Sequence, residues 1–226
     1  MFEFWKRWLG RGSAEESGRV GSNADPIRQM LFASQSLEEQ VSRMRPNVSA
    51  GPLRSLTDAH RLAVEGKRSE ALACLRSVLE VPTLETRVQL WVWSALRELG
   101  AKPEGKAAFE VLGAVLEMPQ QGAYDTLAGY TDGSARYLNF SGSSIIWDAA
   151  DPMIQKLCQD LIDSTIPASR RAKLRTSLSL PKRGVQVTML TRSGPFVIAE
   201  PPQTVVAAGG TLMSELIRRA GPGGGN

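Results

Sequence analysis

The side chains that most often carry catalysis are scarce in this sequence of 226 residues. It has one histidine, His60, and two cysteines, Cys74 and Cys158. These residues are too few for a histidine-ligated metal, a structural zinc site or a disulfide framework. Both cysteines fall among apolar helical positions, where thiols usually act as small hydrophobes. We therefore expect no bound metal, no cofactor, and no catalysis by histidine or cysteine.

Carboxylates and serines are the remaining candidates for a catalytic site. The curvature of a sheet could bring together two of four aspartates, which are Asp125, Asp132, Asp148 and Asp151. Asp132 also suits a turn, and Asp151 also suits a helix N-cap, so both have a structural explanation. A small enzyme with a carboxylate and serine site around these residues is the alternative to a binding protein.

Two glycine-containing segments are candidates for binding an anion. The Ser-Gly-Ser-Ser run at 141–144 lacks the lysine and the following helix of a phosphate-binding P-loop. The Gly-Gly-Thr run at 209–211 is expected to precede the last helix, whose first N–H groups would be free. Ordinary helix capping is the favoured explanation of the second segment.

The positive charge of the chain is concentrated in one segment. Seven basic residues and no acidic residue lie between Ser164 and Ala199, which leaves 20 basic and 23 acidic residues elsewhere. The candidates for binding an anion or an acidic partner are Arg170, Arg171, Lys173, Arg175, Lys182 and Arg183. A solvated helix face is the alternative. The stretch 170–183 contains no aromatic residue for base stacking, so nucleic acid is disfavoured as the partner.

Residues 1–10 carry the sharpest functional signal. At 100° per residue, their apolar side chains fall within an arc of roughly 160°, with basic side chains opposite. The expected docking residues are Phe2, Phe4, Trp5, Lys6, Arg7, Trp8 and Leu9. Such a helix suits an anionic membrane interface or a hydrophobic groove of a partner. Docking on the protein's own folded part is the alternative.

Helices are expected in the first half of the chain. Residues 11–24 are polar and glycine-rich, which is typical of a flexible linker. Asp25-Pro26 is expected to begin a helix whose apolar residues continue to Met44. Three helical patterns follow at about 56–65, 68–80 and 84–99, and the last has apolar residues on two sides.

Part of this helical region resembles a known repeat family. Its residues are Ala63-Val64-Glu65-Gly66, then Ala71, Leu75, Val78 and Pro82. Gly100 follows Gly66 by 34 residues, the period of tetratricopeptide repeats. The stretch 57–100 is therefore similar to a tetratricopeptide helical hairpin, in which glycine permits the tight turn and a small residue lets the helices approach. One repeat and a fraction cannot make a solenoid, so the hairpin must pack on other elements.

After Gly105 the pattern changes to β. Four strands are expected near 109–118, 124–130, 136–140 and 145–147, with a hairpin turn at Asp132-Gly133. A recurrence of 71–82 at 108–119 would instead make 107–117 a helix, but Gly113 and the neighbouring hairpin favour a strand. A helix from Asp151, a basic and weakly helical stretch to Leu178, a hairpin at 185–198 and a last helix complete the chain.

This order predicts an α+β fold, with N-terminal helices followed by an antiparallel β-meander, flanking helices, and a C-terminal hairpin plus helix. The expected organisation is an amphipathic helix at 1–10, a linker at 11–24, a helical region at 25–104, an α+β domain at 105–220 and a disordered tail at 221–226. No apolar run reaches the roughly 18 residues that a membrane-spanning helix needs.

The sequence favours a non-catalytic interaction or adaptor protein of bacterial type. Its helical hairpin and sheet face would bind a protein partner, and the N-terminal block would dock on a membrane or partner. The chain lacks the apolar core and cleavage site of a secretory signal, so we expect it in the cytoplasm, with peripheral association at the inner face of the membrane.

Overall fold

The computed structural model describes residues 26–43, 52–120, 123–181 and 184–221. The predicted helix 1–10, the linker 11–24, and the tail after residue 221 lie outside these ranges. The chain divides into two compact units, described separately below. A sheet unit comprises the described residues of 1–32, 111–190 and 195–226, and a helical unit comprises 33–110 with 191–194. The predicted α+β class is confirmed.

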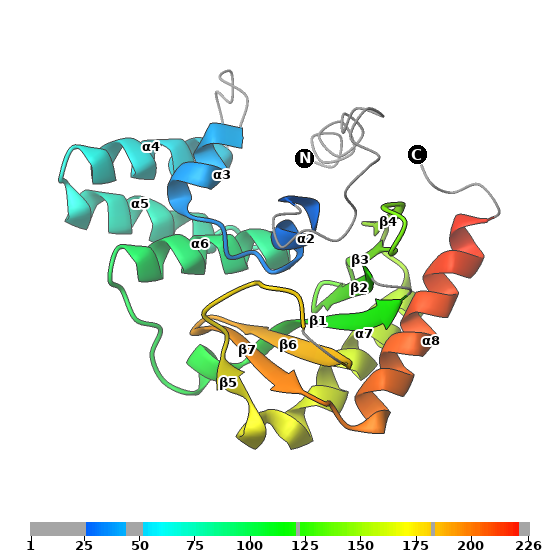
Figure 1. Ribbon diagram of the computed structural model, residues 1–226. Helices are drawn as coiled ribbons and strands as arrows, with labels where there is room; N and C mark the ends of the chain where they lie inside the picture. Colours follow the sequence, from blue (N-terminus) through cyan, green and yellow to red (C-terminus); the bar gives the residue numbers. More distant parts are fainter. Residues whose placement is uncertain (1–25, 44–51, 121–122, 182–183, 222–226) are drawn as a thin grey trace. The chain divides into compact units, whose positions relative to one another are not determined.

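The helical unit contains the three predicted helices. They are α4 (Pro52–Val64), α5 (Arg68–Leu79) and α6 (Thr86–Glu98), and a short 3-10 helix, η1 (Lys106–Phe109), follows them (Figure 1). Helix α6 contacts both α5 and the shorter α3 (Leu37–Arg43), as its two apolar sides predicted. The interior of this unit is formed by apolar side chains that include Leu56, Ala59, Ala71, Leu75, Val92 and Leu96.

The single helix predicted from Asp25 to Met44 is wrong. The chain instead forms α2 (Pro26–Leu31), which belongs to the sheet unit, and α3, which belongs to the helical unit. A capping box starts α3, because Ser36 Oγ accepts a hydrogen bond from Glu39 N at 3.1 Å and Ser36 N donates one to Glu39 Oε2 at 2.9 Å. This reciprocal pair gives the backbone a new helix start and ends the continuity that the apolar spacing suggested.

The predicted β-meander is confirmed. Its strands are β1 (Val111–Gln120), β2 (Ala123–Tyr130), β3 (Ala135–Leu138) and β4 (Ser144–Trp147), each paired antiparallel with the next. Residues from 111 onward in the ambiguous segment form a strand, and only 106–109 is helical. Gly113 lies opposite Tyr130 in the ladder, and a Cβ at Gly113 would come within 2.8 Å of the Tyr130 ring. Gly113, which would weaken a helix, is therefore required in the strand because a side chain there would collide with Tyr130.

The turn at Asp132-Gly133 joins β2 to β3. Gly133 has a φ of 79°, and Tyr130 N donates to Ser134 O at 3.0 Å. Asp132 Oδ1 accepts hydrogen bonds from Ser134 N and Ser134 Oγ. A three-residue loop that ends in a left-handed glycine is a common hairpin connection, because glycine adopts positive φ without steric cost.

The sheet unit continues with helices and three further strands. The elements are α7 (Pro152–Thr165), η2 (Ile166–Arg171), β5 (Lys173–Leu174), β6 (Gln186–Thr191), β7 (Gly194–Ala199) and α8 (Gln203–Ala220). Strands β5, β6 and β7 join the four strands of the meander in a seven-stranded antiparallel sheet, in the order β4-β3-β2-β1-β6-β7-β5. Strand β5 is therefore one edge of this sheet (Figure 1).

Two predictions in this part are wrong. The Gly-Gly-Thr run at 209–211 lies inside α8 rather than before it, so it offers no free helix N-terminus. Gly209 is there for packing, since a Cβ at this position would come within 2.3 Å of Leu116 Cδ2. The stretch after Pro167 is not a weak helix to Leu178: it makes the short η2, and then Lys173 and Leu174 pair with Val197 and Phe196 at the sheet edge.

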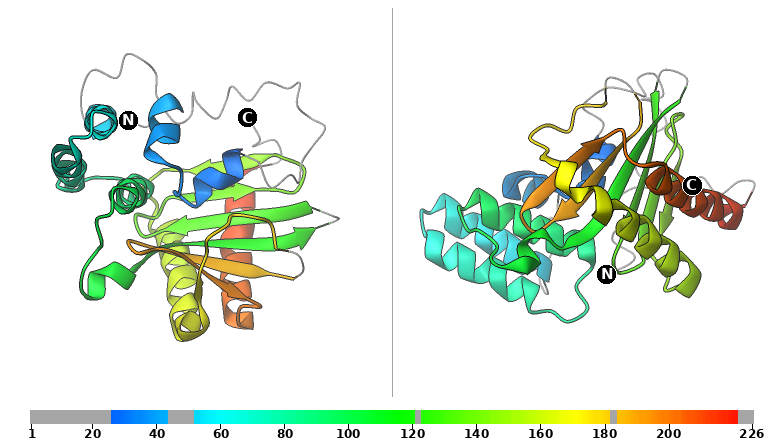
Figure 2. Two further views of the ribbon diagram at one scale, coloured as in Figure 1. Left: turned by 60° about the vertical axis from the view of Figure 1, so that its left-hand side comes forward. Right: turned by 90° about the horizontal axis from the view of Figure 1, so that it is seen from below.

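The two faces of the sheet are covered differently. Helices α7 and α8 pack on one face, and α2 lies against the other (Figure 2). The first face holds an apolar core that includes Leu116, Leu127, Ile154, Leu161, Val187 and Leu212. Residues alternate between faces along a strand, so Glu117 points to the α2 side. Among the described helices, none has the length and hydropathy required to cross a membrane.

Candidate functional site

The four candidate aspartates each have a structural partner. Asp125 accepts a hydrogen bond from Phe140 N at 2.8 Å, and Asp132 stabilises the β2–β3 turn. Asp148 pairs with Arg136. Asp151 caps α7 by accepting from Met153 N and Ile154 N, which with Arg219 lowers its pKa. Their carboxylates are thus used in local structure.

The remaining candidates for catalysis have structural surroundings as well. Cys158 is fully buried on α7, and burial raises the pKa of its thiol to about 12, so the thiol is protonated at neutral pH. Tyr137 lies beside Asp125, and burial raises its pKa to about 12. Cys74 is partly buried on α5 and is a free thiol, and His60 is partly exposed on α4. Within the described ranges, no group of three or more metal-ligating side chains comes together.

The predicted basic segment is divided by the fold. Arg170 and Arg171 are exposed on η2, and Lys173 is exposed on β5. Arg175, in contrast, is 8% exposed and pairs with Glu117, so it is not available to an outside anion. Lys182 and Arg183, like the docking residues Phe2–Leu9, lie outside the described residues.

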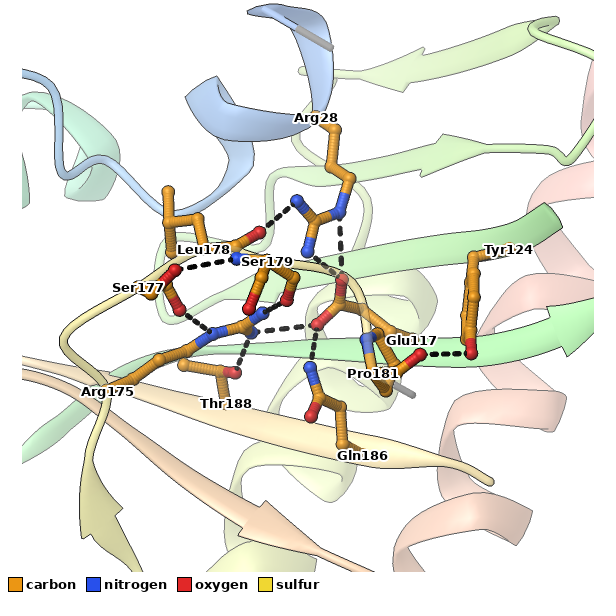
Figure 3. Close-up of polar contacts among 10 residues, drawn as sticks. All are labelled: Arg28, Glu117, Tyr124, Arg175, Ser177, Leu178, Ser179, Pro181, Gln186 and Thr188. Carbon is orange, nitrogen blue, oxygen red and sulfur yellow. Dashed lines mark hydrogen bonds and ion pairs between the residues drawn. The ribbon is translucent and has the colours of Figure 1, made fainter. Parts of the chain in front are cut away.

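Glu117 forms the centre of a buried ion-pair cluster, which also contains Arg28 from α2, Arg175 and Gln186 (Figure 3). Glu117 Oε1 accepts from Arg28 Nε at 2.9 Å and from Arg28 Nη2. Glu117 Oε2 accepts from Arg175 Nη1 at 2.8 Å and from Gln186 Nε2 at 2.6 Å. Both carboxylate oxygens are therefore saturated by donors, which makes Glu117 a structural anion and unsuitable as a general base.

Backbone carbonyls accept further hydrogen bonds from the two guanidinium groups of the cluster. Arg175 Nε donates to Ser177 O at 3.0 Å and Nη2 donates to Ser179 O at 2.8 Å, while Arg28 donates to Leu178 O. Arg175 Nη1 also donates to Thr188 Oγ1 at 2.7 Å. Buried charges are tolerated when their hydrogen-bonding groups are satisfied in this way.

The same contacts hold the stretch 175–181, which we call the strap, against the α2 face of the sheet (Figure 3). The Phe32 ring stacks with both guanidinium groups, at 5.2 Å from Arg28 Cζ and 4.7 Å from Arg175 Cζ. Tyr124 donates its hydroxyl to Pro181 O at the far end of the strap. The cluster therefore fixes the path of the chain immediately after β5.

Outside this cluster, η2 and β5 form what we call the basic corner: Ile166, Arg170, Arg171, Lys173 and Leu174. Ile166 is 52% exposed and Leu174 is 55% exposed. Its three cations are exposed and make no ion pair with any described residue. The corner therefore presents unneutralised positive charge and apolar surface together, on backbone held by Arg175.

Glu117 and Arg28 were not among the site residues expected from the sequence. The available signal was a glutamate inside the apolar strand run Val115-Leu116-Glu117-Met118, where a charge needs a buried counter-ion. No sequence feature indicated which arginines supply it, because Arg28 and Arg175 lie 89 and 58 residues away. Comparisons with known protein families, with curated proteins and with solved structures find no match to this chain.

Proposed function

We propose that this protein is a non-catalytic interaction protein of the adaptor type. Its helical unit binds a protein partner, and the N-terminal block Phe2–Leu9 docks on a membrane surface or on a groove of that partner. The observation that carries the proposal is that the side chains considered for catalysis have structural roles in the described part of the chain. The candidate carboxylates cap, brace turns or pair with arginines, and the Cys158 thiol is buried.

The helical unit supports a role in partner binding through its repeated geometry. Gly66 follows the last turn of α4 and has a φ of 76°. Gly100 lies 34 residues later, follows the last turn of α6 and has a φ of 78°. Lys67 N donates to Leu62 O and Ala101 N donates to Leu96 O, both at 2.9 Å. The same helix ending recurs at the tetratricopeptide period, so we propose that α4–α6 is a short tetratricopeptide-like element.

The N-terminal block supports a docking role through its composition. Four large aromatic residues and two cations lie within its first eight residues. An isolated helix of this length is marginal in water, so it needs a surface for its apolar arc. A bilayer interface and a hydrophobic protein groove both provide such a surface.

The proposal is tested by placing negative charges on the apolar side of the N-terminal block in the full chain. In the variant Trp5→Glu plus Trp8→Glu, we expect an unchanged melting temperature together with a strong reduction of sedimentation with anionic vesicles or loss of partner capture. Ser13→Glu plus Ser17→Glu adds the same charge to the linker and should change neither. Val64→Glu, which charges an apolar side chain 76% exposed on α4, should weaken capture of a protein partner only.

Two results would contradict the proposal. A much lower melting temperature of the tryptophan variant would make the N-terminal block part of the folded core. Binding equal to that of the unaltered chain in both assays would remove its docking role. An enzyme with a carboxylate site remains the alternative, and it requires turnover that Asp125→Asn or Asp148→Asn abolishes without unfolding.

A further inference from the structure

The basic corner contains exposed aliphatic side chains together with cations that make no ion pair with a described residue. Arg170, Arg171 and Lys173 lie within four residues of one another, and Ile166 and Leu174 flank them. The nearest acidic residues along the chain are Asp163 and Glu200. Asp163 accepts a hydrogen bond from Gln159 Nε2 at 2.8 Å. The corner therefore keeps its positive charge.

The backbone of the corner is fixed before any ligand arrives. Lys173 and Leu174 pair with β7, and Arg175 N donates to Pro195 O at 2.8 Å. The Arg175 side chain extends into the Glu117 cluster and holds the chain on the far side of β5. Because this backbone is already ordered, binding costs mainly the side-chain freedom of the exposed residues.

We propose that the basic corner is a binding site for the surface of an anionic lipid bilayer, separate from the N-terminal block and beyond the proposed function. Cations near such a surface are attracted to its headgroups, and exposed aliphatic side chains gain by entering the interface. Lys173 and Leu174 are consecutive in an edge strand, so their side chains project to opposite sides of the sheet. The bilayer therefore meets the rim of the sheet edge-on.

Other anionic partners fit these observations less well. Residues 164–181 contain no aromatic side chain on which a base could stack. Strand β5 is two residues long, which is too short a template for an added peptide strand. Neither a nucleic acid nor an extended acidic peptide gives Ile166 and Leu174 an apolar surface to enter.

The affinity of the corner alone is expected to be low. Each cation near an anionic bilayer increases partitioning about fivefold, so three give roughly a hundredfold. Stable attachment to a bilayer generally needs two signals, and the corner supplies one that is independent of residues 1–10. This arrangement predicts weak, reversible and salt-sensitive binding when the N-terminal block is inactivated.

The experiment measures partitioning of the full chain to phosphatidylserine–phosphatidylcholine vesicles, in the Trp5→Glu plus Trp8→Glu background. We expect residual binding that high salt removes and that pure phosphatidylcholine vesicles do not support. Arg170→Glu plus Arg171→Glu plus Lys173→Glu should reduce it by roughly a hundredfold or more. The matched control reverses three exposed cations elsewhere, Arg76→Glu plus Lys102→Glu plus Lys106→Glu, and should retain most of the binding.

A second pair of variants separates a bilayer from other anions. Ile166→Ser plus Leu174→Ser should weaken vesicle binding severalfold and leave retention on a phosphate-bearing polyanion resin unchanged, whereas Val64→Ser plus Ile217→Ser should change neither. Equal vesicle binding by the charge-reversal variant and its control would overturn the proposal, provided both melt like the parent. So would loss of resin binding by the aliphatic variant, or tight oligonucleotide binding without vesicle binding. Loss of all vesicle binding in the tryptophan background, before any corner change, would also overturn it while leaving the N-terminal docking role intact.

Discussion

Two ion-pair clusters lie on opposite faces of the same sheet and use the same chemistry in different surroundings. The Glu117 cluster is buried on the α2 face, where Glu117 is 0% exposed and both arginines are 4% exposed at their side chains. The Arg219 cluster lies on α8, where Arg219 pairs with Asp151 and Glu215 and stacks on Trp147 at 5.3 Å. Its members keep about a fifth of their side-chain surface in water.

The difference in burial decides what each cluster does. In water, an ion pair gains little because solvent already stabilises the separate charges and salt screens the attraction. In the interior, an unpaired charge has no such alternative, so each member depends on the others. The Glu117 cluster therefore specifies how α2, the strap and the sheet fit together, and the Arg219 cluster reinforces a helix end.

The largest effect is expected for Glu117→Gln. The change removes the carboxylate that Arg28 and Arg175 share, so both buried guanidinium groups lose the counter-charge that Glu117 provides. Loss of one partner of a buried ion pair costs about 3–5 kcal/mol of the free energy of unfolding. Urea unfolding followed by circular dichroism measures this loss. Glu80→Gln is the matched control, since Glu80 follows the same Val-Leu pair but is exposed at the end of α5.

A second variant tests whether the Glu117 cluster is needed for stability once none of its members is charged. Replacing all three charged members, in the variant Arg28→Met plus Glu117→Leu plus Arg175→Met, removes all three charges of the cluster at once. Buried ion pairs exchanged for apolar side chains of similar size often leave stability unchanged or increased. Recovery of most of the stability lost in Glu117→Gln is the expected result. Equal urea midpoints for Glu117→Gln and Glu80→Gln would mean that burial does not determine how much Glu117 contributes to stability.

The glutamates at 80 and 117 also show what could be predicted from the sequence. Local signals sufficed for the helices of 52–98, the meander and the Gly133 turn, because amphipathic spacing and turn chemistry act within a few residues. The recurrence of Val-Leu-Glu at 78–80 and 115–117 suggested two similar helices. The second copy is a strand because Tyr130 and its ladder neighbours, which are tertiary partners, determine the outcome.

The candidate site was predictable only as a segment. The acid-free run 164–199 correctly indicated concentrated positive charge, and Arg170, Arg171 and Lys173 lie at the surface. The burial of Arg175 depends on Glu117, which lies 58 residues away, and no local pattern encodes that pairing. Similarly, the capping box at Ser36 and Glu39 could be read from the sequence, but the apolar spacing across it suggested a single helix.

A smaller effect is expected when the exposed cluster loses its central cation. Arg219→Met removes the pairs with Asp151 and Glu215 and keeps an aliphatic side chain against Trp147. From the usual strengths of exposed and buried pairs, the shift of the urea midpoint should be about a quarter of that for Glu117→Gln or less. High salt should reduce the shift further, because salt screens exposed charges. A shift as large as that of Glu117→Gln would remove the distinction between the clusters.

The smallest effect concerns one carboxylate of the exposed cluster and appears only in acid. Hydrogen bonds from Arg218 and Arg219 lower the pKa of Glu215 to about 2, from an ordinary value of 4.5. Because the folded-state pKa lies below that of the unfolded chain, the ionised form stabilises the fold above pH 4.5, and this contribution is lost as the pH falls towards 2. Subtracting the melting temperature of Glu215→Gln from that of the unaltered protein isolates this carboxylate from all others. The difference should be small and constant above about pH 5 and should shrink towards zero near pH 2. A difference that does not change with pH would mean that Glu215 contributes through packing alone, and a difference confined to neutral pH would place the titrating group elsewhere.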